Sequence, residues 1–268
     1  MDQETIKYKY GYVAYFDILG FKETIKRCES PKEFEELFRF YETIKETFKQ
    51  RFPEMKMSFC SDSVFLTCEN YEYGKHNGIQ VFAPIYLLAK ELYERLHLLF
   101  RGGITLGWFY HSETNIFGEA VNRAVELENL AKTSRILLDP KKNLVKTSWS
   151  NSIRDLDGCL CVNLYMEHFA SCFKPVREKC VLNRKTAFQT LLFILEETRT
   201  SVIRMCQPNI GKPIAEKYLF QCYAYNQHVR LIAHHIQEID DFNEYIKRLS
   251  KEEKQKILSY IIRTEELQ

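Results

Sequence analysis

Two aspartates and one arginine lie within or beside short apolar runs of the sequence. Aspartate side chains can bind divalent cations, and arginine side chains can bind phosphates. Asp17 follows the apolar run YVAYF, Asp62 lies between two serines in FCSDSVF, and Arg101 precedes two glycines in RGGITLG. Singly, each has an ordinary structural explanation, because aspartates commonly cap helices and occupy turns. If the two aspartates meet at one edge of a sheet, however, their carboxylates supply the oxygen ligands that Mg²⁺ or Mn²⁺ prefers.

The elements that must position these residues alternate between strands and helices. Strands are expected at residues 10–19, 56–60, 64–68, 101–107 and 134–138, with 56–60 and 64–68 forming a hairpin whose tip carries Asp62. Amphipathic periodicity predicts helices over residues 31–51 and 81–99, and a third that starts near Gly118. This order predicts an α+β fold of the ferredoxin-like kind, with a mostly antiparallel sheet and packed helices.

The second half of the chain has a different pattern. Residues 1–140 are expected to form the catalytic core and residues 141–268 a mixed, then mainly helical, extension packed on it. Helices are expected at 188–204, 216–237 and 241–266, whereas residues 141–182 are ambiguous, with one or two strands considered around 160–165. The pattern leaves open whether this extension regulates the core or serves in dimerisation.

Composition excludes several classes of protein. The net charge of the 268 residues is only +2, which argues against a nucleic-acid binder. Nine cysteines are scattered without a CxxC pair, so that Cys159 and Cys161 alone give a weak metal signal. The first residues lack the apolar core of a signal peptide, and no apolar run approaches the roughly 20 residues that span a bilayer. A reducing, cytoplasmic setting with free thiols is expected.

At this point the motifs resemble a known family. FDILGF, SDS between two strands, RGGIT-G, FGEAVNRAVELE and the following RI resemble, in this order, the catalytic domain of class III adenylate and guanylate cyclases. The resemblance covers roughly residues 10–140, about half the chain. The particular residues of these motifs, together with the C-terminal half of the chain, most resemble the bacterial pyrimidine cyclases of Pycsar antiphage defence. That resemblance implies a cyclic nucleotide messenger, which a separate effector reads in antiviral defence.

The resemblance also implies roles for individual residues. Asp17, Asp62 and the backbone carbonyl of Ile18 would hold two metal ions, Mn²⁺ or Mg²⁺, in the two-metal manner of phosphoryl displacement. Arg101 matches a phosphate-contacting arginine and Asn122 the asparagine that orients the ribose. The residues expected around the phosphates are Phe16, Ile18, Leu19, Gly20 and Phe21. Because the family builds its active sites between two head-to-tail catalytic domains, a homodimer is implied.

The chain departs from the family pattern at the transition-state arginine, which lies four residues after the asparagine. Glu126 stands at that place and cannot stabilise a developing negative charge. Three replacements stay open: Arg123, Arg135, or Arg101 in a double role. Weaker chemistry is the fourth explanation.

The second departure concerns the residues that read the base. Ser58 and Asn115 occupy the places of the purine-reading pair, and they match neither the adenylate nor the guanylate version. This difference favours a pyrimidine substrate, since the Asn115 amide can address uracil or cytosine. An aromatic side chain such as Phe40 or Tyr41 is a candidate to fill the space left by a smaller base. UTP, giving cyclic UMP and diphosphate, is preferred over CTP.

Two other functions deserve comparison with cyclase activity. A degenerate cyclase fold would bind nucleotide without turnover, and Glu126 is its best support. A polymerase-type palm also uses two carboxylates and two metals, but the near-neutral charge leaves no basic channel for nucleic acid.

Overall fold

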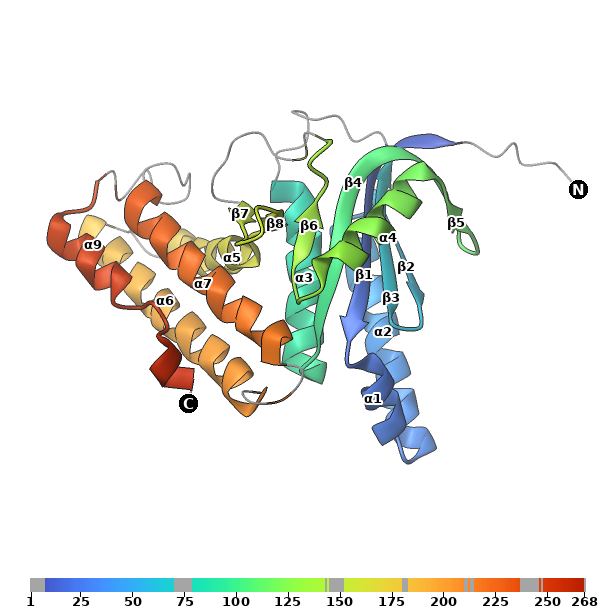
Figure 1. Cartoon of the computed structure of the whole chain (residues 1–268), viewed down its shortest axis with the longest axis horizontal. Coiled ribbons are helices and arrows are strands. Elements are labelled where there is room, and N and C mark those ends of the chain that lie inside the picture. Colours follow the sequence, from blue (N-terminus) through green and yellow to red (C-terminus); the bar gives the residue numbers. More distant parts are fainter. Residues whose placement is uncertain are drawn as a thin grey trace, which may run out of the picture. The chain divides into compact units, whose positions relative to one another are not determined.

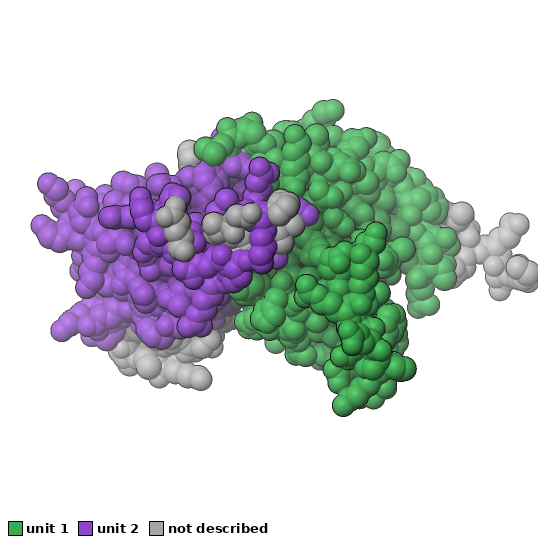
Figure 2. All heavy atoms as spheres, turned by 60° about the horizontal axis from the view of Figure 1, so that its bottom comes forward, with its two compact units in different colours: residues 1–146, 156–161 green, residues 147–155, 162–268 purple. Residues whose placement is uncertain are grey.

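The chain forms two compact units, which Figure 2 colours separately. The computed structural model describes residues 8–69, 79–142, 144, 152–179, 183–209, 212, 215–236, 246 and 248–267. The first unit comprises residues 1–146 and 156–161, and the second comprises residues 147–155 and 162–268.

A sheet with ferredoxin-like strand order lies at the centre of the first unit (Figure 1). Its strands are β1 (Lys9–Leu19), β2 (Met55–Cys60), β3 (Ser63–Glu69), β4 (Leu99–His111), β5 (Ile116–Phe117), β6 (Ile136–Leu138) and β8 (Leu160–Val162). The order is β2-β3-β1-β4-β6-β8, with β5 paired to β4. β1 lies antiparallel between β3 and β4, and β6 is parallel to β4. The predicted α+β class and ferredoxin-like arrangement are therefore confirmed.

The helices of this unit are α1 (Phe21–Arg27), α2 (Pro31–Arg51), α3 (Ile79–Leu96) and α4 (Glu119–Ala131). α2 begins with a capping box, in which Ser30 and Glu33 satisfy each other's backbone N–H groups. α2 and α3 contact each other, whereas α4 packs on β1, β4 and β6. Val13 of β1 meets Ala120 and Ala124 of α4 in a buried cluster, which identifies the sheet face that α4 covers.

Close packing on both faces of β4 depends on the two glycines that follow Arg101. A Cβ atom on Gly103 would lie 2.4 Å from the carbonyl oxygen of Ala124 and 2.3 Å from Cβ of Leu127. On the opposite face, a Cβ on Gly102 would lie 2.3 Å from the ring of Phe16. Only glycine fits at either position, so the pair of glycines after Arg101 lets the helix and the Phe16 ring pack directly on the strand.

The second unit is mainly helical. Its elements are β7 (Ser152–Arg154), α5 (Leu164–Lys179), α6 (Arg184–Cys206), η1 (Gln207–Asn209), α7 (Ala215–His235), α9 (Lys251–Leu258) and η3 (Thr264–Leu267). A buried apolar core joins α5, α6, α7 and α9. Within it, the buried Tyr225 hydroxyl donates a hydrogen bond to the Leu195 carbonyl at 2.9 Å. Within the described ranges, no helix is both long enough and apolar enough to cross a membrane.

Several expected element bounds were wrong. α1 and α5 form where no helix was expected, and β4 extends beyond the expected 101–107 at both ends. The helix expected over 241–266 is wrong at both ends, because the described residues 246 and 248–250 are not helical and α9 covers only Lys251–Leu258. The chain after Leu258 is fastened to α7. There the Asn226 side chain accepts a hydrogen bond from the Ile262 backbone nitrogen at 2.8 Å and donates one to the Ile262 carbonyl at 2.9 Å. This bidentate clamp holds residue 262 outside a helix. Residues 241–245 lie outside the described residues.

Candidate active site

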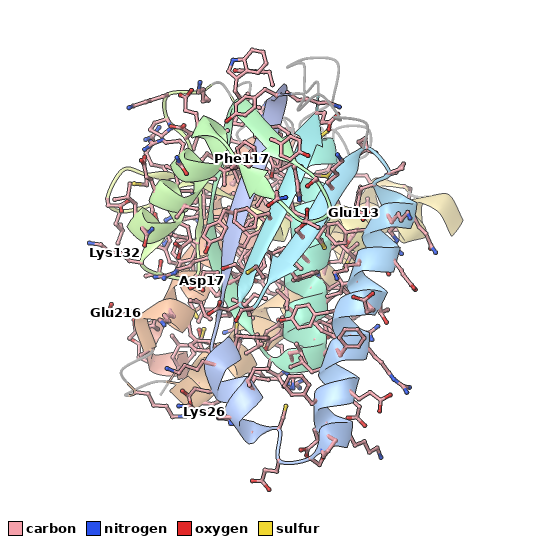
Figure 3. The ribbon with its side chains drawn as sticks, turned by 90° about the vertical axis from the view of Figure 1, so that its right-hand side faces the viewer. Asp17, Lys26, Glu113, Phe117, Lys132 and Glu216 are labelled. Carbon is pink, nitrogen blue, oxygen red and sulfur yellow. The ribbon has the colours of Figure 1, made fainter. Side chains whose placement is uncertain are left out.

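Asp17 and Asp62 come from neighbouring elements at one end of the sheet. The backbone N–H of Ile18 donates to the carbonyl oxygen of Asp62 at 2.7 Å, which fastens the β2–β3 turn to the end of β1. In the register of the two strands, Asp17 lies opposite Ser63. Ser61 has a φ of 58°, a left-handed conformation that the tight turn requires. Figure 3 shows Asp17 at the end of β1 nearest α1.

Arg101 is the cation beside these carboxylates. It lies opposite Asp17 in the β1–β4 pair, and its Nε donates to Asp17 Oδ2 at 3.2 Å. The same Nε lies 2.5 Å from Glu128 Oε1 of α4 and forms an ion pair with it. Burial raises the pKa of Glu128, and the nearby Asp17 adds to this, although Arg101 opposes it. One guanidinium therefore serves two carboxylates, one of them almost fully buried.

The segment after Asp17 was expected to surround the phosphates. Gly20 has a φ of 86° and precedes α1, so the backbone there turns in a way that favours glycine. The side chains of Phe16 and Ile18 are buried in the core, with Phe16 edge-on to Phe100, so only their backbone atoms are available to a ligand. Phe21 is also buried and packs edge-on to Tyr41.

The other two arginines considered for the transition state, Arg123 and Arg135, also hold structural partners. Arg123 donates to Asp139 through Nε at 3.2 Å and through Nη2 at 3.1 Å, and to Glu126 at 3.0 Å. Burial raises the pKa of Asp139, but its hydrogen bonds with Arg123 and Thr105 bring it below the ordinary value.

Arg135 is the more deeply buried of the two. It donates to the Ala131 carbonyl at 2.7 Å and to Asp157 at 2.7 Å, a hydrogen bond that lowers the pKa of Asp157 to about 2. By contrast, Asn122 and Glu126 are exposed and lie one turn apart on α4.

The strand register arranges the site in rows across the face that α4 partly covers. Cys60, Ser63, Asp17 and Arg101 form one row, and Ser58, Phe65, Tyr15 and Gly103 form the next. Adjacent same-face rows are about 7 Å apart. The rings of Tyr15 and Phe65 lie 4.7 Å apart between centroids, and the Tyr15 hydroxyl is 2.8 Å from Ser63 Oγ. The Tyr15 and Phe65 rings therefore lie in the row next to the carboxylates, which is also the row of Ser58.

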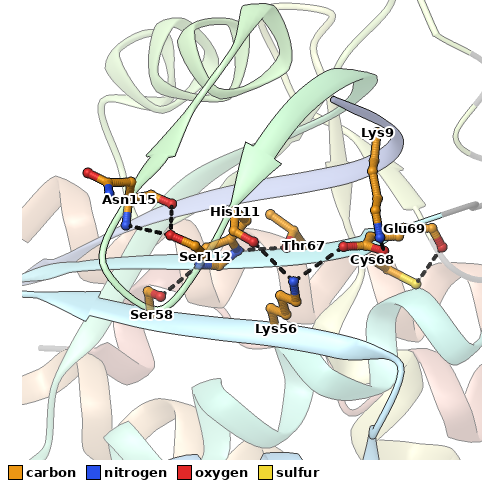
Figure 4. A network of polar contacts seen from close by, with 9 residues as sticks. All are labelled: Lys9, Lys56, Ser58, Thr67, Cys68, Glu69, His111, Ser112 and Asn115. Atoms are coloured by element: carbon orange, nitrogen blue, oxygen red, sulfur yellow. Dashed lines mark hydrogen bonds and ion pairs between the residues drawn. The ribbon is translucent and has the colours of Figure 1, made fainter. Parts of the chain in front are cut away.

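Ser58 belongs to a polar network around His111, shown in Figure 4. Ser58 Oγ is 2.7 Å from His111 Nε2, and Thr67 Oγ1 is 2.7 Å from His111 Nδ1. Burial lowers the pKa of His111 to about 4, and the neighbouring Lys56 charge adds to this effect. Asn115 lies in the exposed β4–β5 turn, where its backbone N–H donates to Ser112 Oγ at 3.1 Å and its side chain donates to Thr114.

An apolar pocket opens beside the Asp62 turn. Its volume is about 220 Å³, and its lining includes Phe21, Tyr41, Phe59 and Ser61. The Tyr41 hydroxyl is buried without a hydrogen-bond partner in the described part of the chain, and burial raises the pKa of this phenol. Tyr41 and Phe40 were the two aromatic residues considered for filling the space left by a smaller base. Tyr41 lines the pocket, whereas Phe40 does not. Phe40 is buried, and the centre of its ring lies 6.0 Å from the Arg95 guanidinium.

Several solved structures have a fold similar to that of this chain. The adenylyl cyclase CyaB from P. aeruginosa is 19% identical with a TM-score of 0.41, over 50% of this chain and 79% of that one. The dimeric guanylyl cyclase domain of the RhoGC fusion protein from the aquatic fungus Blastocladiella emersonii is 13% identical with a TM-score of 0.44, over 58% and 94%. The guanylate cyclase domain of RhGC from Catenaria anguillulae is 16% identical with a TM-score of 0.41, over 58% and 95%.

These three similar structures are all nucleotide cyclase domains. At such low identity and TM-score they carry no argument about residues or activity here. No protein-family model matches the chain, and no curated protein matches it.

Sequence reasoning missed three residues of the site. Glu128, His111 and Asp139 each place a titratable side chain in a buried position. Glu128 was visible as an acid on the apolar stripe of α4, four residues after the buried Ala124. No local signal distinguished His111, because its partners lie on two other strands. Within the described ranges, no group of three or more His, Cys, Asp or Glu side chains is arranged to hold a metal ion.

Proposed function

We propose that this chain is a nucleotide cyclase that converts UTP to 3′,5′-cyclic UMP and diphosphate. The observation that carries the proposal is the convergence of Asp17 and Asp62 at one sheet end, tied by the Ile18–Asp62 backbone bond. The order of the sequence motifs around them supports it independently. CTP is the nearest alternative substrate.

The donor set fits divalent cations of the Mg²⁺ or Mn²⁺ type. Asp17 and Asp62 are carboxylates at a partly exposed sheet end, and hard cations take such oxygen ligands. With the carbonyl of Ile18 they would hold two ions, although they form a smaller set than a closed structural site. When bound, such ions lower the pKa of the ribose 3′-hydroxyl and neutralise the triphosphate.

The chain's own residues then have distinct tasks. Arg101 is the candidate for stabilising phosphate charge, because it already lies beside Asp17. Arg123 and Arg135 are weaker candidates, because the carboxylates that they hold are Asp139 and Asp157, whereas Arg101 holds the proposed metal ligand Asp17. Asn122 is exposed on α4 and would orient the ribose. Gly20 permits the close backbone approach that a triphosphate needs.

The proposed active site requires a homodimer. The Asp17–Asp62 end and the exposed Asn122 would belong to one active site only when two copies pair head to tail, as the family resemblance implies. The cyclic product would act as a messenger in antiviral defence, read by a separate effector. That role rests on the sequence resemblance to Pycsar cyclases alone.

The test is incubation of the purified protein with each of the four NTPs and Mn²⁺, with products read by mass spectrometry. Cyclic UMP that disappears in Asp17→Ala and Asp62→Ala supports the proposal, with Glu36→Ala on the exposed face of α2 as the matched control. Cyclic CMP would shift the substrate to CTP. Cyclic AMP or GMP would keep the activity but contradict the pyrimidine argument.

A second candidate is a nucleotide-binding module without turnover. Glu126 is exposed at the place of the transition-state arginine and pairs with Arg123, so an acid stands at this place and the neighbouring guanidinium is engaged. Binding of nucleotide without any cyclic product would favour this function.

A further inference from the structure

His111 connects three strands through its two ring nitrogens. It is 5% exposed, and it lies 2.7 Å from Ser58 of β2 and 2.7 Å from Thr67 of β3. With a pKa of about 4, lowered mainly by burial, the imidazole is neutral near pH 7. A neutral imidazole carries one proton, so one of its nitrogens donates and the other accepts.

The surroundings of Thr67 decide which nitrogen carries that proton. Thr67 is 1% exposed, and among the described residues its hydroxyl bonds only to His111 Nδ1. A buried hydroxyl hydrogen needs an acceptor, so Thr67 donates to Nδ1. The proton of the imidazole is therefore on Nε2, which donates to Ser58 Oγ. Since Ser58 Oγ accepts this bond, its own hydrogen is left for another partner.

Ser58 is partly exposed on the sheet face that carries Asp17, one row away from it. We propose that the Thr67–His111–Ser58 relay makes Ser58 a hydrogen-bond donor that selects bases with a carbonyl at pyrimidine position 4 or purine position 6, uracil and guanine, over cytosine and adenine, which carry an amino group there. The proposal rests on the proposed cyclase function and deepens it. Thr67 and His111 are positioning residues, and Ser58 contacts the base.

The chemistry of the two pyrimidines explains the selection. Uracil presents a carbonyl acceptor at position 4, whereas cytosine presents an amino donor there. A donor fixed opposite that position pairs with uracil, but it faces another donor in cytosine and leaves both unsatisfied. Sites built around such a bond reject the wrong partner more strongly than they favour the right one.

The tautomer is tested directly by ¹⁵N NMR of the nucleotide-free protein, with His111→Gln to assign the signals. We expect a protonated Nε2 and a bare Nδ1. A proton on Nδ1 would overturn the proposal, because Ser58 would then donate to His111 and offer only lone pairs to the base. This measurement requires no enzymatic activity.

Base selection is tested by binding of the four 3′-deoxynucleoside triphosphates, which lack the hydroxyl needed for cyclisation. We expect the uracil and guanine analogues to bind roughly tenfold more tightly than the cytosine and adenine analogues. Ser58→Ala should abolish this preference. Thr67→Val should weaken this preference, although the buried Thr67 side chain does not itself contact the base. Thr67→Ser, which keeps the hydroxyl, should retain it.

Thr198→Val is the matched control, because Thr198 is also buried and donates to a single carbonyl, that of Ile194, in the second unit. It should leave the preference unchanged. Equal, tight binding of the uracil and cytosine analogues overturns the base relay but leaves the cyclase proposal standing. Absence of binding by all four overturns both. Preference for guanine over uracil supports the relay and contradicts only the pyrimidine assignment.

Discussion

Arg101 lies directly across the β1–β4 pair from Asp17, with its Nε 3.2 Å from the Asp17 carboxylate. The same guanidinium contacts the buried Glu128 of α4. A cation bound at Asp17 would repel the guanidinium, and Glu128 would then be the partner that keeps Arg101 beside the site. The contact thus links the proposed metal-binding end of the sheet to α4, the helix that carries Asn122.

Glu128→Gln should therefore weaken triphosphate binding more than the chemical step. Loss of the anchoring charge lets Arg101 pair with Asp17 alone, so we expect KM for UTP to rise by roughly tenfold with a smaller change in kcat. Steady-state kinetics measure both constants. Glu119→Gln is the control, since Glu119 is an exposed glutamate on the same helix. An unchanged KM in Glu128→Gln would refute this role.

Two inactive variants should complement each other if the active site is shared between copies. An equimolar mixture of Asp17→Ala and Asn122→Ala forms heterodimers that contain one intact site, so we expect about a quarter of the wild-type activity after subunit exchange. A mixture of Asp17→Ala and Asp62→Ala removes the same half of both sites and should stay inactive. Activity in neither mixture contradicts the shared site.

Gly103→Ala should destabilise the first unit. Its new methyl group would overlap the Ala124 carbonyl and Leu127, so α4 must move away from β4, at a cost of about 3 kcal/mol. Gly107→Ala is the graded comparison, because its Cβ would lie 3.1 Å from the Ala120 methyl group, a contact that a small shift relieves. Denaturant unfolding measures both. Equal losses would contradict the close packing at Gly103.

Acid should destabilise the fold through two buried histidines. Burial lowers the pKa of His228 to about 3, and that of His111 is about 4, both below the 6.5 of a free imidazole. The unfolded chain therefore takes up protons first, so their stabilising effect is complete above about pH 6.5 and declines as the pH falls toward 4.

Each of these histidines should account for about 2 kcal/mol of lost stability between pH 7 and pH 5. His228→Leu should flatten the dependence of the unfolding free energy on pH over that range, because a group that cannot be protonated has replaced one that can. Chemical denaturation at a series of pH values measures the slope. A slope equal to that of the wild type would show that His228 does not titrate in this way.

The variants Arg123→Met and Arg101→Met should distinguish an arginine that stabilises the fold from one that takes part in catalysis. Removing Arg123 leaves the buried Asp139 carboxylate without its cation, and we expect a loss of about 2 kcal/mol in stability with most of kcat retained. Arg101→Met should instead lower kcat/KM by roughly a hundredfold. Thermal melts and kinetics at a temperature where both variants are folded distinguish the two. A catalytic collapse in Arg123→Met would make Arg123 the replacement arginine.

How much of the site was predictable depended on the range of the interactions. Asp17, Asp62 and Arg101 were predicted from short motifs of neighbouring residues, and their roles in the site stay predictions. Ser58 and Asn115 were found only by comparison with the family pattern. His111 was not found, because its role arises from hydroxyls on β2 and β3 that are 44 to 53 residues distant in the chain.

The sequence by itself determined the alternation of strands and helices, because the spacing of apolar residues specifies each element locally. It also showed the two glycines after Arg101, whose small size permits close packing on the strand. It did not determine where α9 ends, since the Asn226 side chain that clamps Ile262 comes from another helix. Only the tertiary structure decided which carboxylate each arginine holds: Asp17 and Glu128 for Arg101, Asp139 for Arg123. Charge pairing depends on distances between elements, and those distances exist only once the elements have packed.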